Sequence, residues 1–196
     1  MADPAYIVDG VLTDGEAWVG IAHASLSLPA TQVTWTSTND GQTGDFSQYM
    51  DLVIVTYGRG DGAAVNGNTM LELNNDSGAN YVKQVLRGDG SSVYAASGTG
   101  LTYWDSGEVP LGGATANVFG ASVIHLFDIN SGKYKSMLSN SASGDHTDTN
   151  SYVTLYAATW TSQAAVTEID LFPRGASNWV AGSVFDLFGV LPRMVA

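Results

Sequence analysis

The chain contains the stretch Asp51-Leu52-Val53-Ile54-Val55-Thr56-Tyr57, in which nearly every residue has a high propensity for β-strands. Successive side chains of a strand point to opposite faces, and here both faces are largely apolar. This pattern is typical of a central strand that is covered on both sides. The following Arg59-Gly60-Asp61-Gly62 predicts a turn, because glycine accepts positive φ at little steric cost.

Alternation of apolar and polar residues recurs along most of the chain, in residues 18–25, 32–37, 69–74, 122–129, 152–157, 167–171 and 183–188. Segments rich in Asn, Asp and Gly separate these runs and predict tight connections. No window predicts a long amphipathic helix, and residues 80–86 favour at most a short one. Residues 88–120, rich in Gly, Ser and Ala, predict a long loop.

These patterns predict an all-β protein: a single antiparallel β-sandwich of about eight to ten strands, with long loops and little helix. A jelly-roll-like topology is preferred, and other Greek-key orders stay open, because strand order is not visible in the sequence. We expect an N-terminal arm at residues 1–16, the sandwich domain at 17–191 and a C-terminal tail at 192–196.

Charge and composition exclude several classes of function. The 196 residues include 19 Asp and Glu but only 7 Lys and Arg, and the net charge of -12 argues against nucleic acid or an anionic membrane surface as partner. There is no cysteine, which removes disulfides and Cys-ligated zinc. Residues 17–39 are uncharged but rich in Gly, Ser and Thr, so we expect no membrane span. The first four residues lack the features of a secretory signal.

One motif suggests catalysis. Glu168-Ile169-Asp170 is similar to the Glu-x-Asp-x-Glu strand of concanavalin-like glycosidases, which place two carboxyls across the scissile bond. The third carboxylate is missing, because Phe172 and Pro173 stand where it should be. We therefore interpret the motif as the polar face of a half-buried strand and predict no catalytic residues and no enzymatic activity.

No cofactor or metal is predicted either. His23, His125 and His146 are isolated in the sequence, and His125 alternates with apolar neighbours, as a hydrogen-bonded core or interface histidine would. Residues 145–150, and residues 39–41 with Asp45, carry oxygen ligands that suit calcium. Ordinary turns stabilised by Asp and Asn side chains explain these segments without an ion.

Aromatic residues offer a different kind of site. Trp35, Trp160 and Trp179 lie in or beside strand patterns and are predicted to be core residues. Tyr103 and Trp104 lie in the predicted long loop, where their rings would be able to stack on a glycan. The alternative is that this pair anchors the loop to the sandwich.

The C-terminal residues 167–189 carry a family resemblance. They read Thr-Glu-Ile-Asp-Leu-Phe-Pro-Arg-Gly-Ala-Ser-Asn-Trp-Val-Ala-Gly-Ser-Val-Phe-Asp-Leu-Phe-Gly, which resembles the closing hairpin of β-sandwich virion proteins of tailed bacteriophages, many from marine and cyanobacterial phages. In that pattern Ile-x-Leu leads through a Gly-Asn-aromatic loop to Gly-Ser-x-Phe-x-Leu-Tyr-Gly, and Phe188 stands here in place of the Tyr. The likeness extends more loosely to residues 17–57 and 125–140.

The resemblance implies a non-enzymatic structural protein of the virion, made in the cytoplasm of the bacterial host. A lone domain without a fibrous shaft favours a capsid decoration (cement) protein or head-knob subunit over a complete tail fibre. The implied partners are the major capsid protein or other virion proteins, together with further copies of the chain, most often as a trimer. The alternative function is a tail-fibre or host-recognition module that binds cell-surface glycan.

The apolar chain ends are candidate docking elements. Tyr6, Ile7 and Val8 near the start, and Leu191, Met194 and Val195 near the end, have no evident place in the alternating core. We expect one or both ends, together with exposed apolar strands, to bind a neighbouring subunit or the capsid. The alternative is that an end completes the sandwich of its own subunit.

Overall fold

The computed structural model describes residues 7–8, 11–12, 18–38, 44–144, 151–175 and 177–191. Strands dominate these ranges, and a short 3₁₀ turn, η1 (Phe46–Gln48), is their single helical element. Strands β1 (Ile7–Val8) and β2 (Val11–Leu12) pair with each other. The other strands form two antiparallel sheets, of eight and four strands, so the predicted sandwich is confirmed. Among the described residues, no helix has the length and apolar character that a membrane crossing requires.

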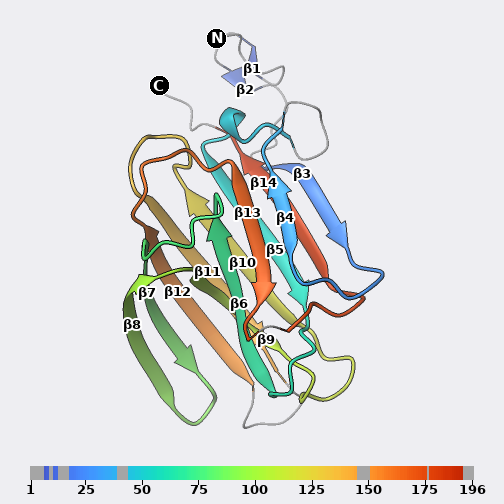
Figure 1. Cartoon of the computed structure of the whole chain (residues 1–196). Helices are drawn as coiled ribbons and strands as arrows, with labels where there is room; N and C mark the ends of the chain where they lie inside the picture. The colour runs from blue at the N-terminus through green and yellow to red at the C-terminus, as the bar shows by residue number, and fades with distance from the viewer. Residues whose placement is uncertain are drawn as a thin grey trace.

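The two sheets are layered face to face, with the smaller sheet in front in Figure 1. In order across the larger sheet, the strands are β3 (Trp18–Ser25), β14 (Val184–Val190), β5 (Asp51–Gly58), β10 (Gly120–Phe127), β11 (Lys135–Ser143), β12 (Tyr152–Trp160), β7 (Tyr81–Gly88) and β8 (Val93–Leu101). The smaller sheet has the order β4 (Val33–Thr36), β13 (Glu168–Pro173), β6 (Asn66–Leu73) and β9 (Trp104–Pro110).

The strand order is that of a jelly roll with two added hairpins. The order β3-β14-β5-β10 in one sheet, and β4-β13-β6-β9 in the other, links eight strands by two Greek keys, which is the jelly-roll arrangement. The pairs β7–β8 and β11–β12 are inserted between these strands and extend the larger sheet beyond β10. In Figure 1, β7 and β8 therefore reach past the smaller sheet at the lower left.

The core lies between the two sheets. Fully buried side chains include Ile54 and Phe185 of the larger sheet and Leu71 and Ile169 of the smaller one. The predicted core tryptophans Trp35, Trp160 and Trp179 are all buried. Trp179 packs against the backbone of β5 at Gly58, where an added Cβ would lie 3.0 Å from the ring. The indole N–H of Trp179 donates to the carbonyl of Leu171 over 3.0 Å, which ties the loop of the closing hairpin to β13.

Two local predictions are wrong. Residues 88–120 were expected to form a long loop, but they contain β8 and β9. Residues 80–86 were expected to form at most a short helix, and they lie largely within β7. In both cases cross-strand pairing supplies what local propensity lacks, since β7 pairs with both β12 and β8. The expected cover on both faces of β5 is also incomplete, because Tyr57 is 50% exposed.

Candidate functional site

The outer face of the larger sheet is apolar across its extended half. Side chains alternate along each strand, so every second residue of β7, β8, β10, β11 and β12 points away from the core. The exposed apolar residues on this face are Leu86, Val93, Ala95, Ala121, Val123, Leu138, Ala142, Val153, Leu155 and Ala157. We call this set the outer apolar face.

Cross-strand register makes the outer apolar face continuous. One row runs through Val153, Ala142, Ala121 and Tyr57, which are direct partners on β12, β11, β10 and β5. A neighbouring row joins the partners Leu86, Leu155, Asn140, Val123 and Val55. Val153 is 74% exposed and Val93 is 76% exposed, so these side chains are open to solvent in the described structure. Contiguous exposed apolar patches of this kind mark interaction surfaces.

The outer apolar face also lacks formal charge. None of the outward side chains on β7, β8, β10, β11 and β12, all of which are described, is Asp, Glu, Lys or Arg. Lys83, Arg87 and Lys135 belong to these strands but occupy the alternate, inward positions. In a chain with a net charge of -12, such a gap in the charge pattern favours contact with a second protein surface over solvent exposure.

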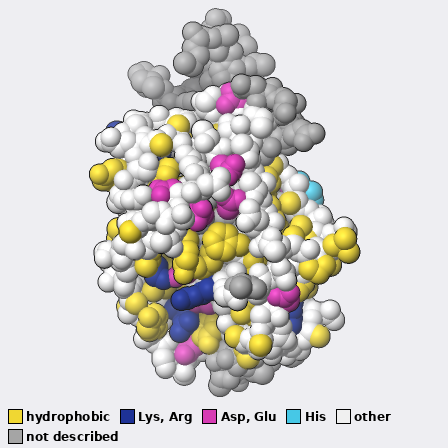
Figure 2. All heavy atoms as spheres, in the orientation of Figure 1, with side chains coloured by type: hydrophobic (Ala, Val, Ile, Leu, Met, Phe, Trp, Pro, Cys, Tyr) yellow, Lys and Arg dark blue, Asp and Glu magenta, His cyan; other side chains and the backbone are white. Residues whose placement is uncertain are grey.

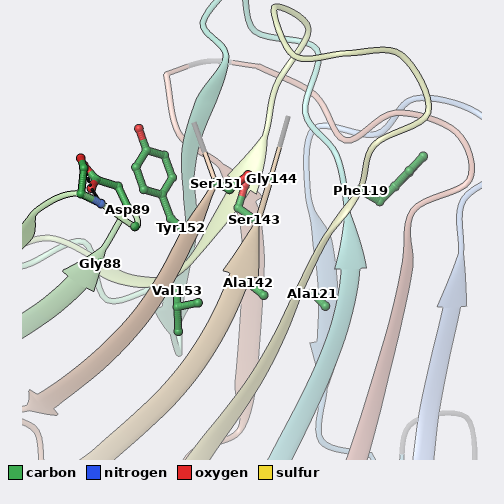
Figure 3. Close-up of a pocket in the computed structure, with 12 residues that line it drawn as sticks. Gly88, Asp89, Phe119, Ala121, Ala142, Ser143, Gly144, Ser151, Tyr152 and Val153 are labelled. Atoms are coloured by element: carbon green, nitrogen blue, oxygen red, sulfur yellow. Dashed lines mark hydrogen bonds between the residues drawn. The ribbon is translucent and has the colours of Figure 1, made fainter. Parts of the chain in front are cut away.

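A hollow of about 880 Å³ lies at one end of this face. Figure 3 shows Ala121, Ala142 and Val153 along its floor, with Tyr152 to one side and Phe119 to the other. Phe119 stacks on Tyr57, with their ring centroids 5.2 Å apart. The apolar floor is suited to receive an apolar side chain from a neighbouring molecule, while Asp89, Ser143 and Ser151 contribute polar groups to the rim.

His125 marks the border of the outer apolar face. Its Nε2 lies 3.1 Å from a carboxylate oxygen of Asp51, and its ring stacks on Phe127 with a centroid distance of 3.9 Å. Asp51 also accepts a hydrogen bond from the backbone N–H of Asp128 over 2.8 Å. His125 is thus held by neighbouring side chains, as a structural histidine would be. Among the described residues, no group of three or more His, Cys, Asp or Glu is arranged to hold a metal ion.

The two residues predicted to stack on a glycan, Tyr103 and Trp104, differ in their exposure. Trp104 is fully buried at the start of β9, so its ring cannot stack on a sugar, and the alternative holds for it: Trp104 anchors its segment to the sandwich. The physical reason is that β9 is the edge of the smaller sheet nearest the added hairpins, and it is buried along its whole length. Tyr103 stays partly exposed and contacts Phe172 edge to face, with ring centroids 6.3 Å apart.

The carboxylates of the Glu168-Ile169-Asp170 motif are held by polar neighbours. Glu168 accepts hydrogen bonds from Thr36, over 2.9 Å, and from Asn75. Asp170 accepts from Thr34 and, over 3.1 Å, from Gln32. Both residues therefore contribute to the polar outer surface of the smaller sheet, on the same face of β13.

Sequence reasoning missed a third carboxylate beside this motif. Glu72 of β6 is the direct cross-strand partner of Asp170. Burial and the negative charges of Asp170 and Asp76 raise the pKa of Glu72, and burial also raises the pKa of Asp170. The only available signal was the polar position of Glu72 between Leu71 and Leu73, which does not reveal its neighbour.

A second polar cluster, also missed, lies where β7 and β8 overhang β9. Lys83 forms an ion pair with Asp105, and Arg87 forms one with Glu108 at 3.3 Å. Both carboxylates are buried, and burial raises the pKa of Glu108 despite the attraction of Arg87. Tyr156 donates a further hydrogen bond to Glu108 over 3.3 Å. Because residues 88–120 were expected to form a loop, the sequence offered no reason to pair these groups.

The other predicted site residues lie outside the described part of the chain, are buried or make local contacts, or have side chains that are not described. Tyr6, Met194 and Val195, the segment 145–150 and residues 39–41 lie outside the described residues. Ile7 and Val8 form β1, whose side chains are not described. Leu191 is 7% exposed, so it packs within its own subunit, and its assignment as a docking residue is wrong. Asp45 caps η1 by accepting from the backbone N–H of Ser47 over 2.9 Å.

Comparisons of the chain with models of known protein families, with curated proteins and with solved structures gave no match. The class that can be stated is therefore the architecture itself: a jelly-roll β-sandwich with an extended eight-stranded sheet. Any function rests on the surfaces described above.

Proposed function

We propose that this protein is a non-enzymatic structural subunit of a tailed-bacteriophage virion, which binds the assembled shell through its outer apolar face. A capsid decoration (cement) or head-knob role suits it best, with synthesis in the cytoplasm of the host. The resemblance of residues 167–189 to the closing hairpin of such proteins supports the virion setting. The jelly roll is also a fold that capsid domains use.

The observation that carries the proposal is the uncharged outer apolar face. Five strands spaced about 4.8 Å apart, each contributing a length of about six residues at about 3.3 Å per residue, present roughly 500 Å². Contact with a matching surface would bury about 1,000 Å² in total, which is near the lower limit for a specific interface. Several copies bound to one lattice would add avidity, which is why a trimeric subunit fits the proposal.

The energetic role follows from binding selectivity. A subunit that binds the assembled shell, and not the free capsid protein, stabilises the shell by its own binding free energy. Burial of apolar side chains such as Val153 and Leu155 supplies that free energy without any chemical step. The negative charge carried elsewhere on the subunit keeps the unbound form from associating nonspecifically.

The test introduces one charge into the outer apolar face. Val153→Lys should lower the number of subunits per particle at least tenfold, because an unpaired lysine would have to be desolvated at the interface. The matched control is Leu28→Lys, since Leu28 is also 74% exposed but lies in the loop after β3. Purified variants would be added to particles of the parent phage that lack the subunit, and bound copies counted by cryo-electron microscopy. Equal occupancy for both folded variants contradicts the proposal.

The second candidate function, recognition of a host glycan, is favoured by a separate observation. Tyr103 borders a polar hollow over the smaller sheet, on the opposite side of the sandwich from the outer apolar face. The two functions are compatible, because one face would attach the subunit and the other would be presented to the surroundings.

A further inference from the structure

Two hollows with charged residues in their linings lie on the side of the molecule that faces the viewer in Figures 1 and 2, and Arg174 borders both. The first, of about 530 Å³, lies over β6 and β13 and is bordered by Glu72, Tyr103, Asp170 and Arg174. The second, of about 450 Å³, lies between β7, β8 and β9. Figure 2 shows acidic side chains above the centre of this face, Lys and Arg side chains below it, and hydrophobic side chains between them.

A carboxylate with an unpartnered oxygen lines the first hollow. Asp170 is 4% exposed, and its Oδ1 accepts the hydrogen bonds from Thr34 and Gln32. Its Oδ2 is buried and has no hydrogen-bond partner among the described residues. The neighbouring Glu72 adds a second carboxylate at the same place. A ligand seated here would meet the partly exposed Glu72 beside Asp170, and groups that donate hydrogen bonds to carboxylates, such as hydroxyls, suit this place.

The second hollow has one more positive than negative side chain in its lining. Lys83, Arg87 and Arg174 border it together with Asp105 and Glu108, although the whole chain has only 7 Lys and Arg. Lys83 and Arg87 are each paired with a carboxylate, whereas Arg174 forms no ion pair within the described part of the chain. The guanidinium of Arg174 donates a long hydrogen bond, over 3.5 Å, to the side-chain oxygen of Asn68. The pKa of Lys83 is lowered first by the burial of Lys83 and second by the positive charge of Arg174. An anion bound beside Arg174 would therefore relieve the repulsion between Lys83 and Arg174.

The second hollow also holds an acceptor that lacks a donor. Asp105 is 3% exposed and pairs with Lys83 through Oδ2, while its Oδ1 has no partner among the described residues. Because Asp105 lines this hollow, an occupant that brings hydroxyl donors as well as an anionic group would suit both Asp105 and Arg174. A bare anion without a donor, such as sulfate, would pair with Arg174 and offer no hydrogen bond to Asp105.

Aromatic rings border both hollows. Tyr103 is braced by Phe172 at the first, and Tyr94, which lies 5.1 Å from the Arg87 guanidinium, borders the second. Aromatic faces bind the apolar faces of pyranose rings by burial of area. One class of ligand combines the three properties that these hollows favour. It has hydroxyl donors for the carboxylates, an anionic group for Arg174 and flat apolar faces for the tyrosines.

We infer that the two hollows form a single groove for a saccharide chain that carries a carboxylate-bearing sugar, with the carboxylate beside Arg174 and neutral sugar hydroxyls over Glu72 and Asp170. The inference does not depend on the virion assignment. Nucleic acid is disfavoured by the net charge of -12, and an acidic peptide, whose backbone N–H groups can also donate to carboxylates, is distinguished by the experiment below.

The experiment is calorimetric titration of the full chain with a tetrasaccharide of alternating glucuronic acid and glucose. We expect dissociation constants of about 0.1–1 mM, and binding at least about tenfold weaker for the all-glucose tetrasaccharide. Arg174→Gln should remove most of this preference, because it deletes a charge-assisted contact from an exposed position. Tyr103→Ala should weaken the binding of both tetrasaccharides. Lys133→Gln is the control, since Lys133 is an exposed lysine that pairs with Asp128 outside the groove.

Several outcomes would overturn the inference. One is the absence of binding by either tetrasaccharide at about 10 mM, and another is an unchanged preference in folded Arg174→Gln. Inorganic phosphate or tetraglutamate binding as tightly as the acidic tetrasaccharide would show a simple anion site or a peptide site instead. Subunit occupancy on particles would be measured separately, so that failure of saccharide binding stays distinct from failure of the docking proposal.

Discussion

Glu72 on β6 and Asp170 on β13 lie directly opposite each other in the antiparallel register of the smaller sheet. Two carboxylates in this arrangement repel each other, and like charges directly opposite in a sheet reduce stability. Burial and this repulsion raise the pKa of Glu72 above its ordinary value of 4.5. The pair is therefore a local cost to the fold at neutral pH, which is consistent with a role toward a ligand.

Removing one charge of this pair should stabilise the protein in a pH-dependent way. A raised pKa means that the folded state binds the proton more tightly, so the stabilising contribution is present at low pH and is lost as pH rises through the folded-state pKa. Glu72→Gln should thus raise the free energy of unfolding at pH 7 by about 0.5 kcal/mol, and by less at pH 4. Urea denaturation at both pH values measures the difference.

Asp128→Asn provides the control for this measurement. Asp128 forms an exposed ion pair with Lys133 at 3.5 Å, and such pairs contribute about 0–1 kcal/mol. We expect Asp128→Asn to change the free energy of unfolding only slightly, without the pH dependence expected for Glu72→Gln. A loss of stability in Glu72→Gln at pH 7, or an equal gain at both pH values, would refute the assignment of repulsion to this pair.

Replacing Trp104 should destabilise the fold much more than replacing its neighbour Tyr103. Because Trp104 is fully buried, Trp104→Ala should lower the free energy of unfolding by about 3–5 kcal/mol. Tyr103→Ala removes a partly exposed ring and should cost about 1 kcal/mol. Thermal and urea unfolding of the two variants measure these costs. Similar stabilities for the two alanine variants would contradict the burial described for Trp104.

Arg59 should hold the connection between β9 and β10 in place. Its guanidinium donates to the carbonyls of Thr115, Val118 and Ala114 over 2.6, 3.0 and 2.9 Å. Arg59→Lys keeps the charge but loses the planar fork of donors, so buried carbonyls lose their partners. We expect a loss of about 2–3 kcal/mol, with faster amide hydrogen exchange concentrated in residues 112–119. A uniform change in exchange across both sheets would argue against this local role.

The protein should not cleave the saccharide that it binds. The proposed function needs no chemical step, and Glu168 and one of the two carboxylate oxygens of Asp170 already accept hydrogen bonds from neighbouring side chains. Prolonged incubation with the acidic tetrasaccharide should yield no new reducing ends. Reducing ends that appear with the parent protein and vanish in Glu72→Gln would instead show a hydrolase, and would refute the non-enzymatic proposal.

Local patterns predicted much of the fold and little of the site. Alternation identified the strands that contain Val33, Ile124 and Phe185, and the buried tryptophans were predicted because they lie beside such strands. Residues 88–120 misled the prediction because β8 is rich in small residues and β9 carries Asp105 and Glu108 at buried positions. Those carboxylates are tolerated there because Lys83 and Arg87 come from another strand.

What the sequence by itself determined is the strand content, the turns and the apolar alternation, because propensity and side-chain direction depend on near neighbours. The tertiary structure alone decided the rest. Insertion of two hairpins widened one sheet and left the outer apolar face open, and strand pairing brought Glu72 to Asp170 and Lys83 to Asp105. These relationships join segments that are distant along the chain, and their free energy depends on burial and register, which no local window contains.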